Sequence, residues 1–193
     1  DDIVTIGEEI EDAYGSGIYI KQQENITLED LLYGLMLRSG NDAALAIAKY
    51  VGGSVSDFVT LMNDKAKELG MLNSEFNNPI VLDEEKGNYS TAYDMALLTS
   101  YAMKNDEYKK IVSTKNYKLK TNRNYYSWTN KNKLLFSYKY STGGKTGFTQ
   151  IARRTLVTTA SKDNLNLVVV TLNEGNDFND HKNLFEEAFS EYT

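Results

Sequence analysis

The chain has 193 residues, of which 41% are hydrophobic and 25% charged, so its composition is that of a globular protein and argues against a largely disordered chain or a coiled coil. The 21 basic and 27 acidic residues give a net charge of -6, which disfavours a general nucleic-acid-binding protein. No apolar run approaches the roughly 20 residues of a membrane helix. There is no cysteine and a single histidine, His181, which excludes disulfides, thiolate nucleophiles, cysteine-ligated zinc and any mechanism that needs two histidines.

Helical patterns dominate the first 112 residues. After an irregular, partly extended entry that ends near residue 23, leucine, alanine and other apolar residues recur at helical spacing. Thr27 and Asp30 mark the start of the first helix, and Gly53 and Gly70 mark the ends of the next two. Residues 71–89 are expected to form a long surface loop. The predicted helices span residues 28–38, 43–51, 56–69, 91–103 and 107–112.

Strand patterns dominate the rest of the chain. Short β-rich segments are predicted at residues 117–119, 125–128, 143–149, 155–159 and 165–172. The aromatic residues of the first two segments are expected to pack on a small sheet rather than to form a carbohydrate-binding surface. Helices followed by antiparallel strands indicate an α+β fold. We expect one domain over residues 1–193, with a helical block at 26–112 and strands plus a C-terminal helix at 113–193.

The chain ends in a predicted amphipathic helix over residues 180–192. Its apolar face is expected to consist of Leu184, Phe185, Ala188 and Phe189. His181 lies near the start of this helix, and we expect it on the helix surface rather than in the role of a catalytic base. The Asn- and Asp-rich stretch 173–180 lacks the spacing of an EF-hand loop and is expected to be a polar turn with a helix cap.

Two short motifs carry residue types that a serine acyl-transfer enzyme needs. Ser39-Gly40-Asn41 lies at the break between two predicted helices, and Lys145-Thr146-Gly147 follows two glycines on a predicted strand. Taken singly, the first motif is explained by a helix C-cap followed by an N-cap, and the second by a strand end with a solvated lysine. Together they match two of the three elements of penicillin-interacting serine enzymes. A hydroxyl and a carboxamide can relay a proton and hold a substrate amide, and a lysine with a threonine can bind a carboxylate.

Longer stretches around these motifs resemble the D-alanyl-D-alanine carboxypeptidases, which are low-molecular-mass penicillin-binding proteins of the serine peptidase type. The similar stretches are LLYGLMLRSGNDAALAIA from Leu31, FVTLMNDKAKELGM from Phe58, STAYDMALL from Ser90, GGKTGFT from Gly143 and ARRTLVTTAS from Ala152. The similarity runs through essentially the whole chain. It implies the transpeptidase-like fold shared by serine β-lactamases and penicillin-binding proteins, in which a helical block packs beside an antiparallel sheet.

The resemblance assigns catalytic roles to three residues. Ser39 would relay protons toward the leaving D-alanine. Asn41 would hold the amide carbonyl of the substrate and help to order the active-site lysine. Lys145 would supply positive charge for the substrate carboxylate and support the proton relay.

The resemblance also assigns substrate-binding roles to the residues that follow Lys145. Thr146 would hydrogen-bond the carboxylate, Gly147 would leave space on the strand, and the backbone N–H of Phe148 would be one donor of the oxyanion hole. The family mechanism uses no metal and no cofactor.

The main departure from the family is the absence of its first motif, S-x-x-K, which carries the acylating serine and its lysine base. No serine of this chain is followed by a lysine three residues later. We therefore expect an N-terminally truncated, partial domain that is inactive alone. In the family fold the upstream segment also supplies strands of the central sheet, so the strand at 165–172 would lose a neighbour, and self-association or pairing with that segment is expected.

These observations lead to a functional expectation for the parent protein. It would be a bacterial hydrolase of cell wall biogenesis that removes the terminal D-alanine from peptidoglycan stem peptides ending in D-Ala-D-Ala, through an acyl-serine intermediate. It would bind β-lactams, would not bind nucleic acid, and would act outside the cytoplasmic membrane. The alternatives are a non-catalytic remnant that binds peptidoglycan or a partner, and a β-lactam-hydrolysing relative.

Overall fold

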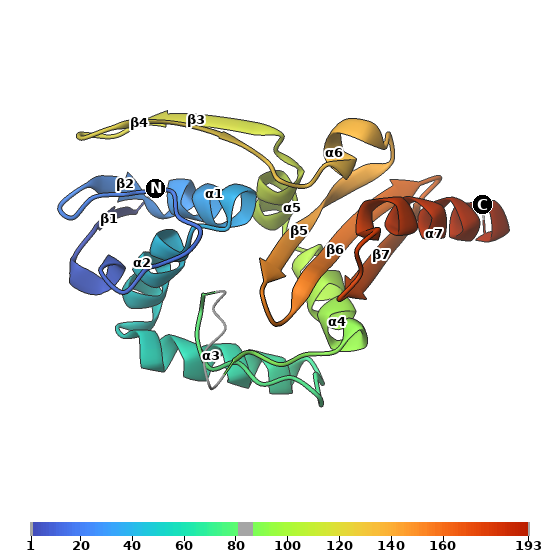
Figure 1. Ribbon diagram of the computed structural model, residues 1–193, viewed down its shortest axis with the longest axis horizontal. Helices are drawn as coiled ribbons and strands as arrows, with labels where there is room; N and C mark the ends of the chain where they lie inside the picture. The colour runs from blue at the N-terminus through green and yellow to red at the C-terminus, as the bar shows by residue number, and fades with distance from the viewer. Residues whose placement is uncertain (1, 81–86, 193) are drawn as a thin grey trace.

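The computed structural model describes residues 2–80 and 87–192 (Figure 1). Helices α1 and α2 lie beside two small two-stranded sheets at one end of the molecule, and a three-stranded sheet with helix α7 lies at the other. The described chain order is β1 (Ile3–Thr5), η1 (Glu8–Ile10), β2 (Asn25–Thr27), α1 (Leu28–Arg38), α2 (Asn41–Gly52), α3 (Val55–Glu68), α4 (Ala92–Ala102), α5 (Asp106–Ser113), β3 (Asn116–Lys120), β4 (Tyr125–Thr129), α6 (Leu134–Ser137), β5 (Ser141–Thr149), β6 (Arg153–Lys162), β7 (Leu165–Leu172) and α7 (Asp177–Tyr192).

The expected start and stop signals of the helices are confirmed. Thr27 and Asp30 form a reciprocal capping box at the start of α1, in which the hydroxyl of Thr27 accepts the backbone N–H of Asp30 at 3.0 Å. Gly53 ends α2 with a φ of +78°, and Gly70 follows α3 with a φ of +75°. Both are left-handed conformations that glycine adopts without steric cost. Local sequence therefore decides where these helices begin and end.

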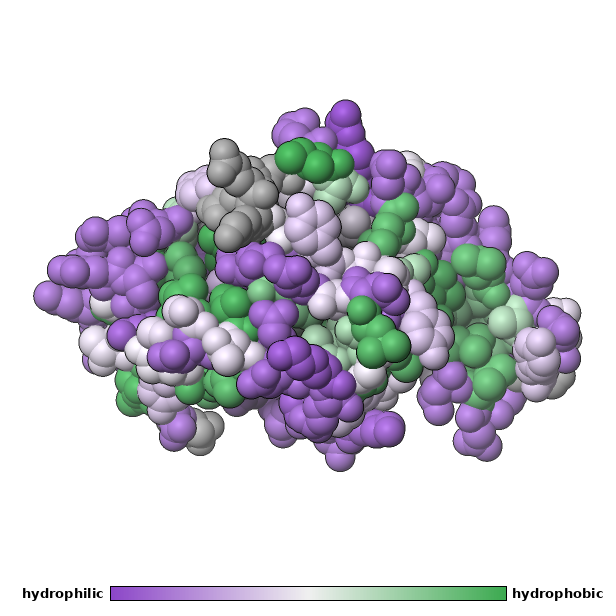
Figure 2. Space-filling view, turned by 90° about the horizontal axis from the view of Figure 1, so that it is seen from below, coloured by the Kyte–Doolittle hydropathy of each residue, from purple (hydrophilic) through white to green (hydrophobic). Residues whose placement is uncertain are grey.

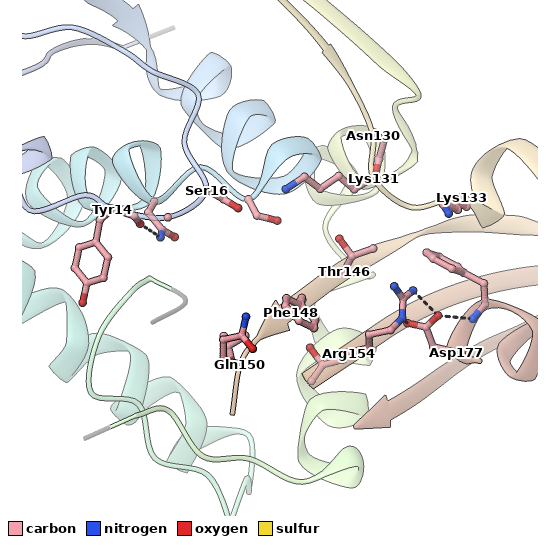
Figure 3. A pocket seen from close by; sticks show the side chains of 17 residues that line it. Tyr14, Ser16, Asn130, Lys131, Lys133, Thr146, Phe148, Gln150, Arg154 and Asp177 are labelled. Carbon is pink, nitrogen blue, oxygen red and sulfur yellow. Dashed lines mark hydrogen bonds and ion pairs between the residues drawn. The ribbon is translucent and has the colours of Figure 1, made fainter. Parts of the chain in front are cut away.

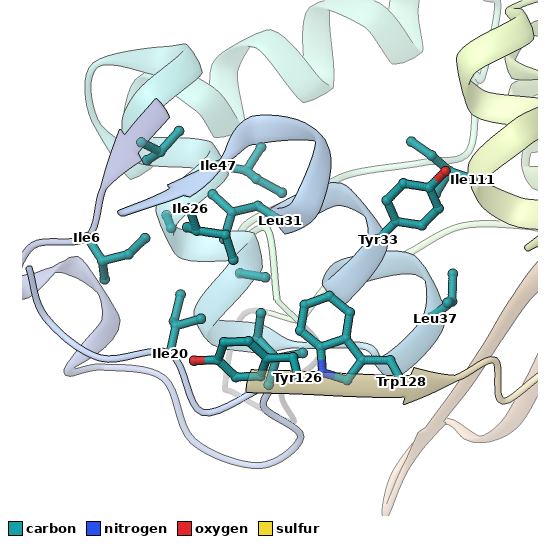
Figure 4. Packing of buried hydrophobic residues seen from close by; sticks show 14 residues of the cluster. Ile6, Ile20, Ile26, Leu31, Tyr33, Leu37, Ile47, Ile111, Tyr126 and Trp128 are labelled. Atoms are coloured by element: carbon teal, nitrogen blue, oxygen red, sulfur yellow. The ribbon is translucent and has the colours of Figure 1, made fainter. Parts of the chain in front are cut away.

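The first hydrophobic core joins α1 and α2 to both two-stranded sheets (Figure 4). Tyr126 and Trp128 of β4 are buried against α1, and Tyr117 of β3 stacks on Tyr33 of α1 with ring centroids 3.7 Å apart. The carboxylates of Glu24 and Asp42 are buried in the same region and accept hydrogen bonds there. One of them, Glu24, accepts hydrogen bonds from the hydroxyl of Tyr126 at 3.0 and 2.9 Å. Tyr117, Tyr126 and Trp128 therefore pack on the protein interior, as the sequence predicts, whereas Tyr125 is 60% exposed.

The second core lies between α7 and the sheet of β5, β6 and β7. The three strands are antiparallel in that order, and the β6–β7 turn places Asp163 and Asn164 at positive φ, as the hairpin signal requires. Because side chains alternate across a strand, Ala160 of β6 and Leu167 of β7 face the same side, where Phe185 of α7 packs against them. One face of the sheet is thereby covered.

The opposite face of the sheet is only partly covered. Helices α4 and α5 lie against it, and between them and the strands is a cavity of about 740 Å³. Its lining includes Thr159 and Val168 from the sheet and Met103 after α4. In the described part of the chain β7 pairs with β6 alone, so its other edge is open. Figure 2 shows apolar side chains at the surface of the end of the molecule that carries the three-stranded sheet.

Helix α7 differs from its predicted form in which side chains it buries. It begins at Asp177 rather than 180, and its buried residues are Asp177, His181, Phe185 and Phe189. The prediction of a surface histidine is wrong, because His181 is fully buried and Leu184 is 46% exposed. His181 fills the space between two strands, with Nδ1 2.6 Å from the hydroxyl of Thr158 on β6 and Nε2 2.9 Å from that of Thr171 on β7. Two threonine hydroxyls that only the sheet brings together make this burial favourable.

The remaining differences are short elements. The sequence patterns miss η1, β2 and α6, none of which exceeds 4 residues. Such short elements carry too few residues for a periodic signal. The predicted loop at 71–89 is irregular where described, with one isolated bridge between Glu75 and Tyr89, and its residues 81–86 lie outside the described part.

We predict that His181 makes the stability of the chain depend on pH. Burial lowers the pKa of His181 to about 4, whereas an unfolded histidine titrates near 6.5. The unfolded state therefore binds more protons between these values, so stability is lost as the pH falls from about 6.5 toward 4. Between pH 7 and 4.5 we expect a loss of about 2 kcal/mol from this residue, measured as a falling urea midpoint.

The control is His181→Gln, which cannot take up the proton. Its midpoint should be lower than that of the unmodified chain at pH 7 and should change less with pH. An equal pH dependence in both proteins would contradict the prediction.

Candidate active site

Ser39 occupies a strained position at the end of α1. Its φ of 61° and ψ of 43° are left-handed, and its backbone N–H donates to the carbonyl of Leu35 at 2.9 Å. A non-glycine residue held in this region costs about 1–3 kcal/mol, and such residues cluster at functional sites. The turn directs the chain from α1 into α2 within two residues. Ser39 is therefore the C-cap of α1 that the sequence predicts, and its side chain carries a hydroxyl.

Asn41 is the first residue of α2 and is buried against the entry segment. Its Nδ2 donates to the carbonyl of Tyr14 at 2.6 Å, and its backbone N–H donates to the carbonyl of Ser16 at 2.8 Å. The next residue, Asp42, accepts the backbone N–H groups of residues 18, 19 and 20 at 3.0, 2.7 and 3.2 Å. The start of α2 therefore holds residues 14–20 in place, although these residues carry no regular secondary structure.

Strand β5 brings Lys145 toward the end of α1. Gly144 precedes it with a φ of +140°, and a Cβ at that position would lie 2.2 Å from the carbonyl oxygen of Val157. A Cβ at Gly147 would lie 2.3 Å from the hydroxyl of Thr155. Glycine is thus required for β5 to approach β6 this closely.

One contact joins the two motifs across 106 residues of sequence. The Nζ of Lys145 lies 2.5 Å from Oγ of Ser39 and 2.6 Å from the carbonyl oxygen of Thr146. An ammonium group donates to both oxygens. The helix break and the strand thereby form a single site.

The electrostatics of this site favour loss of a proton from Lys145. Burial of its ammonium group, together with the positive charge of Lys131, lowers the pKa of Lys145 from 10.5 to about 8. Burial likewise lowers the pKa of Lys131, with a smaller effect from Arg38. A lysine with a pKa near neutrality can exist in both protonation states, which a proton relay needs.

A cavity of about 880 Å³ lies beside this contact (Figure 3). One wall comes from the entry segment and the junction of α1 and α2, and the other from β5, β6 and the start of α7. Five of the six sequence-predicted site residues line it, and the sixth, Lys145, contacts one of them. The five are Ser39, Asn41, Thr146, Gly147 and Phe148.

The remaining lining residues are not found by sequence reasoning. They are Tyr14, Gly15, Ser16, Asn130, Lys131, Lys133, Thr149, Gln150, Arg154, Thr155, Asp177 and Phe178. Most lie in irregular segments or at element ends, where no periodicity marks them. Arg154 is the exception, because counting along the β5–β6 hairpin would have placed it opposite Phe148. Among the described residues no cluster of three or more His, Asp or Glu side chains could hold a metal ion.

Comparison with known proteins identifies a family. The family model described as D-alanyl-D-alanine carboxypeptidase, peptidase S11, matches residues 1–176. The D-alanyl-D-alanine carboxypeptidase DacF of Bacillus subtilis is 40% identical over 157 residues, which are 81% of this chain and 40% of that protein. DacC of Escherichia coli is 34% identical, with 97% of this chain and 48% of that protein covered. The chain thus spans about half the length of these two relatives.

Solved structures agree in fold. The D-alanyl-D-alanine carboxypeptidase of Mycobacterium tuberculosis superimposes with a TM-score of 0.84 at 31% identity, over 89% of this chain and 65% of that one. A mutant of the Streptomyces K15 DD-transpeptidase gives a TM-score of 0.83 at 34% identity, over 89% and 72%. The predicted α+β fold of the penicillin-binding-protein type is therefore confirmed.

We predict that Lys145 titrates near pH 8 in the 193-residue chain. Reductive ¹³C-methylation of the lysines and NMR titration would show one methyl signal with this low pKa, and Lys145→Arg would remove it. Lys131→Gln should raise the pKa of Lys145, because it removes a nearby positive charge.

Lys133→Gln is the matched control, since Lys133 also lines the cavity but does not contribute to this shift. Titration of Lys145 near 10.5, or an equal response to both substitutions, would contradict the prediction.

Proposed function

The chain belongs to the D-alanyl-D-alanine carboxypeptidase family, peptidase S11, and we propose that it supplies the substrate-binding and proton-relay part of an enzyme that trims peptidoglycan. The reaction is removal of the terminal D-alanine from stem peptides that end in D-Ala-D-Ala, through an acyl-serine intermediate. β-Lactams would acylate the same site. The contact between Lys145 and Ser39 carries this proposal, because it assembles the S-x-N and K-T-G motifs at one cavity.

In this proposal the relay residues act on the leaving group. As the C–N bond breaks, the hydroxyl of Ser39 passes its proton to the nitrogen of the departing D-alanine, and the ammonium group of Lys145 returns a proton to Ser39. The proton that the lysine base takes from the acylating serine would restore Lys145 to its charged form. A pKa near 8 for Lys145 supports that role. Asn41 holds the amide carbonyl of the substrate from the start of α2, where its hydrogen bond to Tyr14 fixes the side chain.

The strand residues would bind the substrate itself. β5 forms an edge of the described sheet on the side of the cavity, so an extended peptide can pair with it. Thr146 would hydrogen-bond the terminal carboxylate, Gly147 would allow close approach, and the backbone N–H of Phe148 would donate to the oxyanion. Each of these three residues lines the cavity.

The acylating serine and its base are not among these 193 residues, since the sequence contains no S-x-x-K. We propose that this chain alone is inactive and that a segment with that motif completes the site. The open edge of β7 and the cavity of about 740 Å³ on the uncovered sheet face support such pairing. An added strand would pair with β7, and a further helix would fill the cavity.

The place of action follows from the substrate. Peptidoglycan lies outside the cytoplasmic membrane, so we propose an extracytoplasmic location. None of the described helices is long and apolar enough to cross a membrane.

We predict that benzylpenicillin leaves the mass of this chain unchanged. When the chain is co-expressed with the S-x-x-K segment of a family member, one penicilloyl group should be added to the serine of that segment. Lys145→Ala should slow this acylation about 100-fold or more, because it removes a preorganised charge from the site. Intact-mass spectrometry of both polypeptides measures each outcome.

Lys118→Ala on β3 is the control and should acylate at the unmodified rate. A penicilloyl group on this chain alone would contradict the assignment of the nucleophile to another segment. Absence of acylation in a formed complex would instead favour the non-catalytic binding alternative.

We also predict that the isolated chain self-associates through β7. Val168 and Val170 lie on the partly covered face of this open strand, and a lysine at either position should oppose pairing. Sedimentation velocity should show concentration-dependent association that Val168→Lys reduces, and hydrogen exchange at β7 should slow when the S-x-x-K segment is added. A monodisperse monomer with fast exchange at β7 in both states would contradict this.

A further inference from the structure

The basic residues of this chain are concentrated in one continuous segment. Residues 108–162 contain 13 of the 21 basic residues and none of the 27 acidic ones, although the whole chain has a net charge of -6. The segment includes β3, β4, α6, β5 and β6. Part of its charge lines the active-site cavity, but the β3–β4 hairpin carries basic side chains that the proposed function does not use. Such a separation of charge is typical of a surface that binds an anionic partner.

The hairpin presents a polar face to the solvent. Because side chains alternate across a strand, Tyr126 and Trp128 of β4 point into the core, whereas Tyr125 points outward and is 60% exposed. Lys120 of β3 is the partner of Tyr125 in the strand register and is also exposed. Arg123 lies in the exposed turn between the two strands. Lys120, Arg123 and Tyr125, here called the hairpin tip, place two cations close to an exposed aromatic ring.

The hairpin tip is held in place by a buried carboxylate. Glu24 is fully buried and accepts hydrogen bonds from the hydroxyls of Thr121 and Tyr126. The side-chain oxygen of Asn122 accepts the backbone N–H of Asn25 at 3.0 Å. These contacts attach the tip to β2, whereas an isolated two-stranded hairpin is only marginally stable. A surface that is ordered before binding loses less entropy when a ligand arrives.

The cations of the hairpin tip are not neutralised by neighbouring carboxylates. Within residues 2–80 and 87–192, no ion pair involves Lys120 or Arg123. Arg123 donates instead to the neutral side chain of Gln23, with 3.4 Å between Nη2 and Oε1. An anionic ligand would therefore supply the compensating charge that these two side chains lack.

Further cations lie between the hairpin tip and the cavity. At the far end of β4, Nη1 of Arg38 donates to the carbonyl of Thr129 at 3.1 Å. Burial lowers the pKa of Lys131, which lines the cavity, and the nearby charge of Arg38 lowers it further. The hairpin lies along α1 on the outside of the molecule (Figure 1).

The length of β4 sets the size of a ligand that can reach both places. The strand has 5 residues and so separates the tip from Thr129 by about 17 Å. An extended dipeptide spans only about 7 Å. A ligand that occupies the cavity and also contacts the hairpin tip must therefore be much longer than a D-Ala-D-Ala end.

We propose that the hairpin tip binds a neighbouring stem peptide of the same glycan strand while one stem peptide occupies the cavity, so that polymeric peptidoglycan is preferred to a free unit. This inference rests on the proposed function and names the substrate class of its site. Every stem peptide that ends in D-Ala-D-Ala carries a terminal carboxylate, which complements Lys120 and Arg123. The ring of Tyr125 offers an apolar surface to the sugar or peptide beside that charge. Two linked contacts reinforce each other, because the first raises the effective concentration of the second.

The test compares a polymer with a single unit on the isolated 193-residue chain, which has no S-x-x-K serine to consume either ligand. The polymer is an uncrosslinked glycan strand in which each disaccharide carries a stem peptide ending in D-Ala-D-Ala, and the single unit is one such disaccharide. Thermophoresis of the N-terminally labelled chain, with ligand in excess, gives both dissociation constants. The strand should bind about tenfold more tightly per stem peptide than the single unit. This preference should decrease at high salt.

Substitutions at the hairpin tip should lower the preference for the strand. Lys120→Gln combined with Arg123→Gln should reduce it to about threefold or less, because two charge contacts are lost. The matched control is Lys65→Gln combined with Lys67→Gln on α3, which removes the same charge from the opposite side of the molecule (Figure 1). The control should keep the full preference. Because the preference compares two ligands on one variant, partial unfolding would weaken both affinities and leave it unchanged.

The single unit tests the proposed function, and the preference tests this inference. Equal affinity per stem peptide for strand and unit would overturn the role of the hairpin tip, as would a preference that the Lys120 and Arg123 substitutions leave unchanged. In both cases, binding of the single unit would still support the proposed function. Binding of neither ligand would overturn both.

Two further ligands test whether the hairpin tip recognises stem peptides. A strand whose stem peptides have been removed by an amidase should bind weakly, and linear polyphosphate should not displace the intact strand at equal concentration of charge. Tight binding of the stripped strand would show recognition of sugar, and displacement by polyphosphate would show recognition of any polyanion. Either result would overturn the proposal.

Discussion

The site depends on one contact, between the ammonium group of Lys145 and the hydroxyl of Ser39. Ser39 reaches Lys145 from a left-handed turn that ends α1. The contact also requires Gly144, since any side chain there would collide with β6 and displace the strand. The strain at Ser39 is sustained by its surroundings, in which α2 holds the entry segment through Asn41 and Asp42.

The charge of the cavity is opposite to that of the chain. The chain carries a net charge of -6, yet the cavity is lined by Lys131, Lys133 and Arg154, with Lys145 in contact with Ser39. Burial, with a further contribution from the charge of Lys131, lowers the pKa of Lys145, and the gathered cations make the site attractive to an anionic ligand. The buried carboxylate of Asp177 compensates only one of them directly, Arg154. An anionic peptide end would supply further compensation.

The two faces of the sheet differ in how far they are covered. Helix α7 covers one face through a buried aromatic cluster and His181, and this packing places Asp177 at the rim of the cavity. The other face leaves a cavity beside α4 and α5, and β7 presents an open edge. A sheet that is covered on one face and open on the other can accept a further segment. In our proposal the S-x-x-K segment occupies this place and brings its serine beside Ser39 and Lys145.

The sequence by itself determined the elements and the two motifs, because caps, glycines and apolar periodicity act locally. The limits of α1 at Thr27 and Ser39 and the β6–β7 turn at Asp163 and Asn164 follow from such local preferences. Six site residues were also identified, since they lie in the S-x-N and K-T-G motifs and in the position next to Gly147. Only the tertiary structure decided that His181 is buried and that Asp177 and Lys131 belong to the cavity. Their positions depend on strand register and on the docking of α7, which arise from contacts between residues far apart in the chain and leave no local pattern.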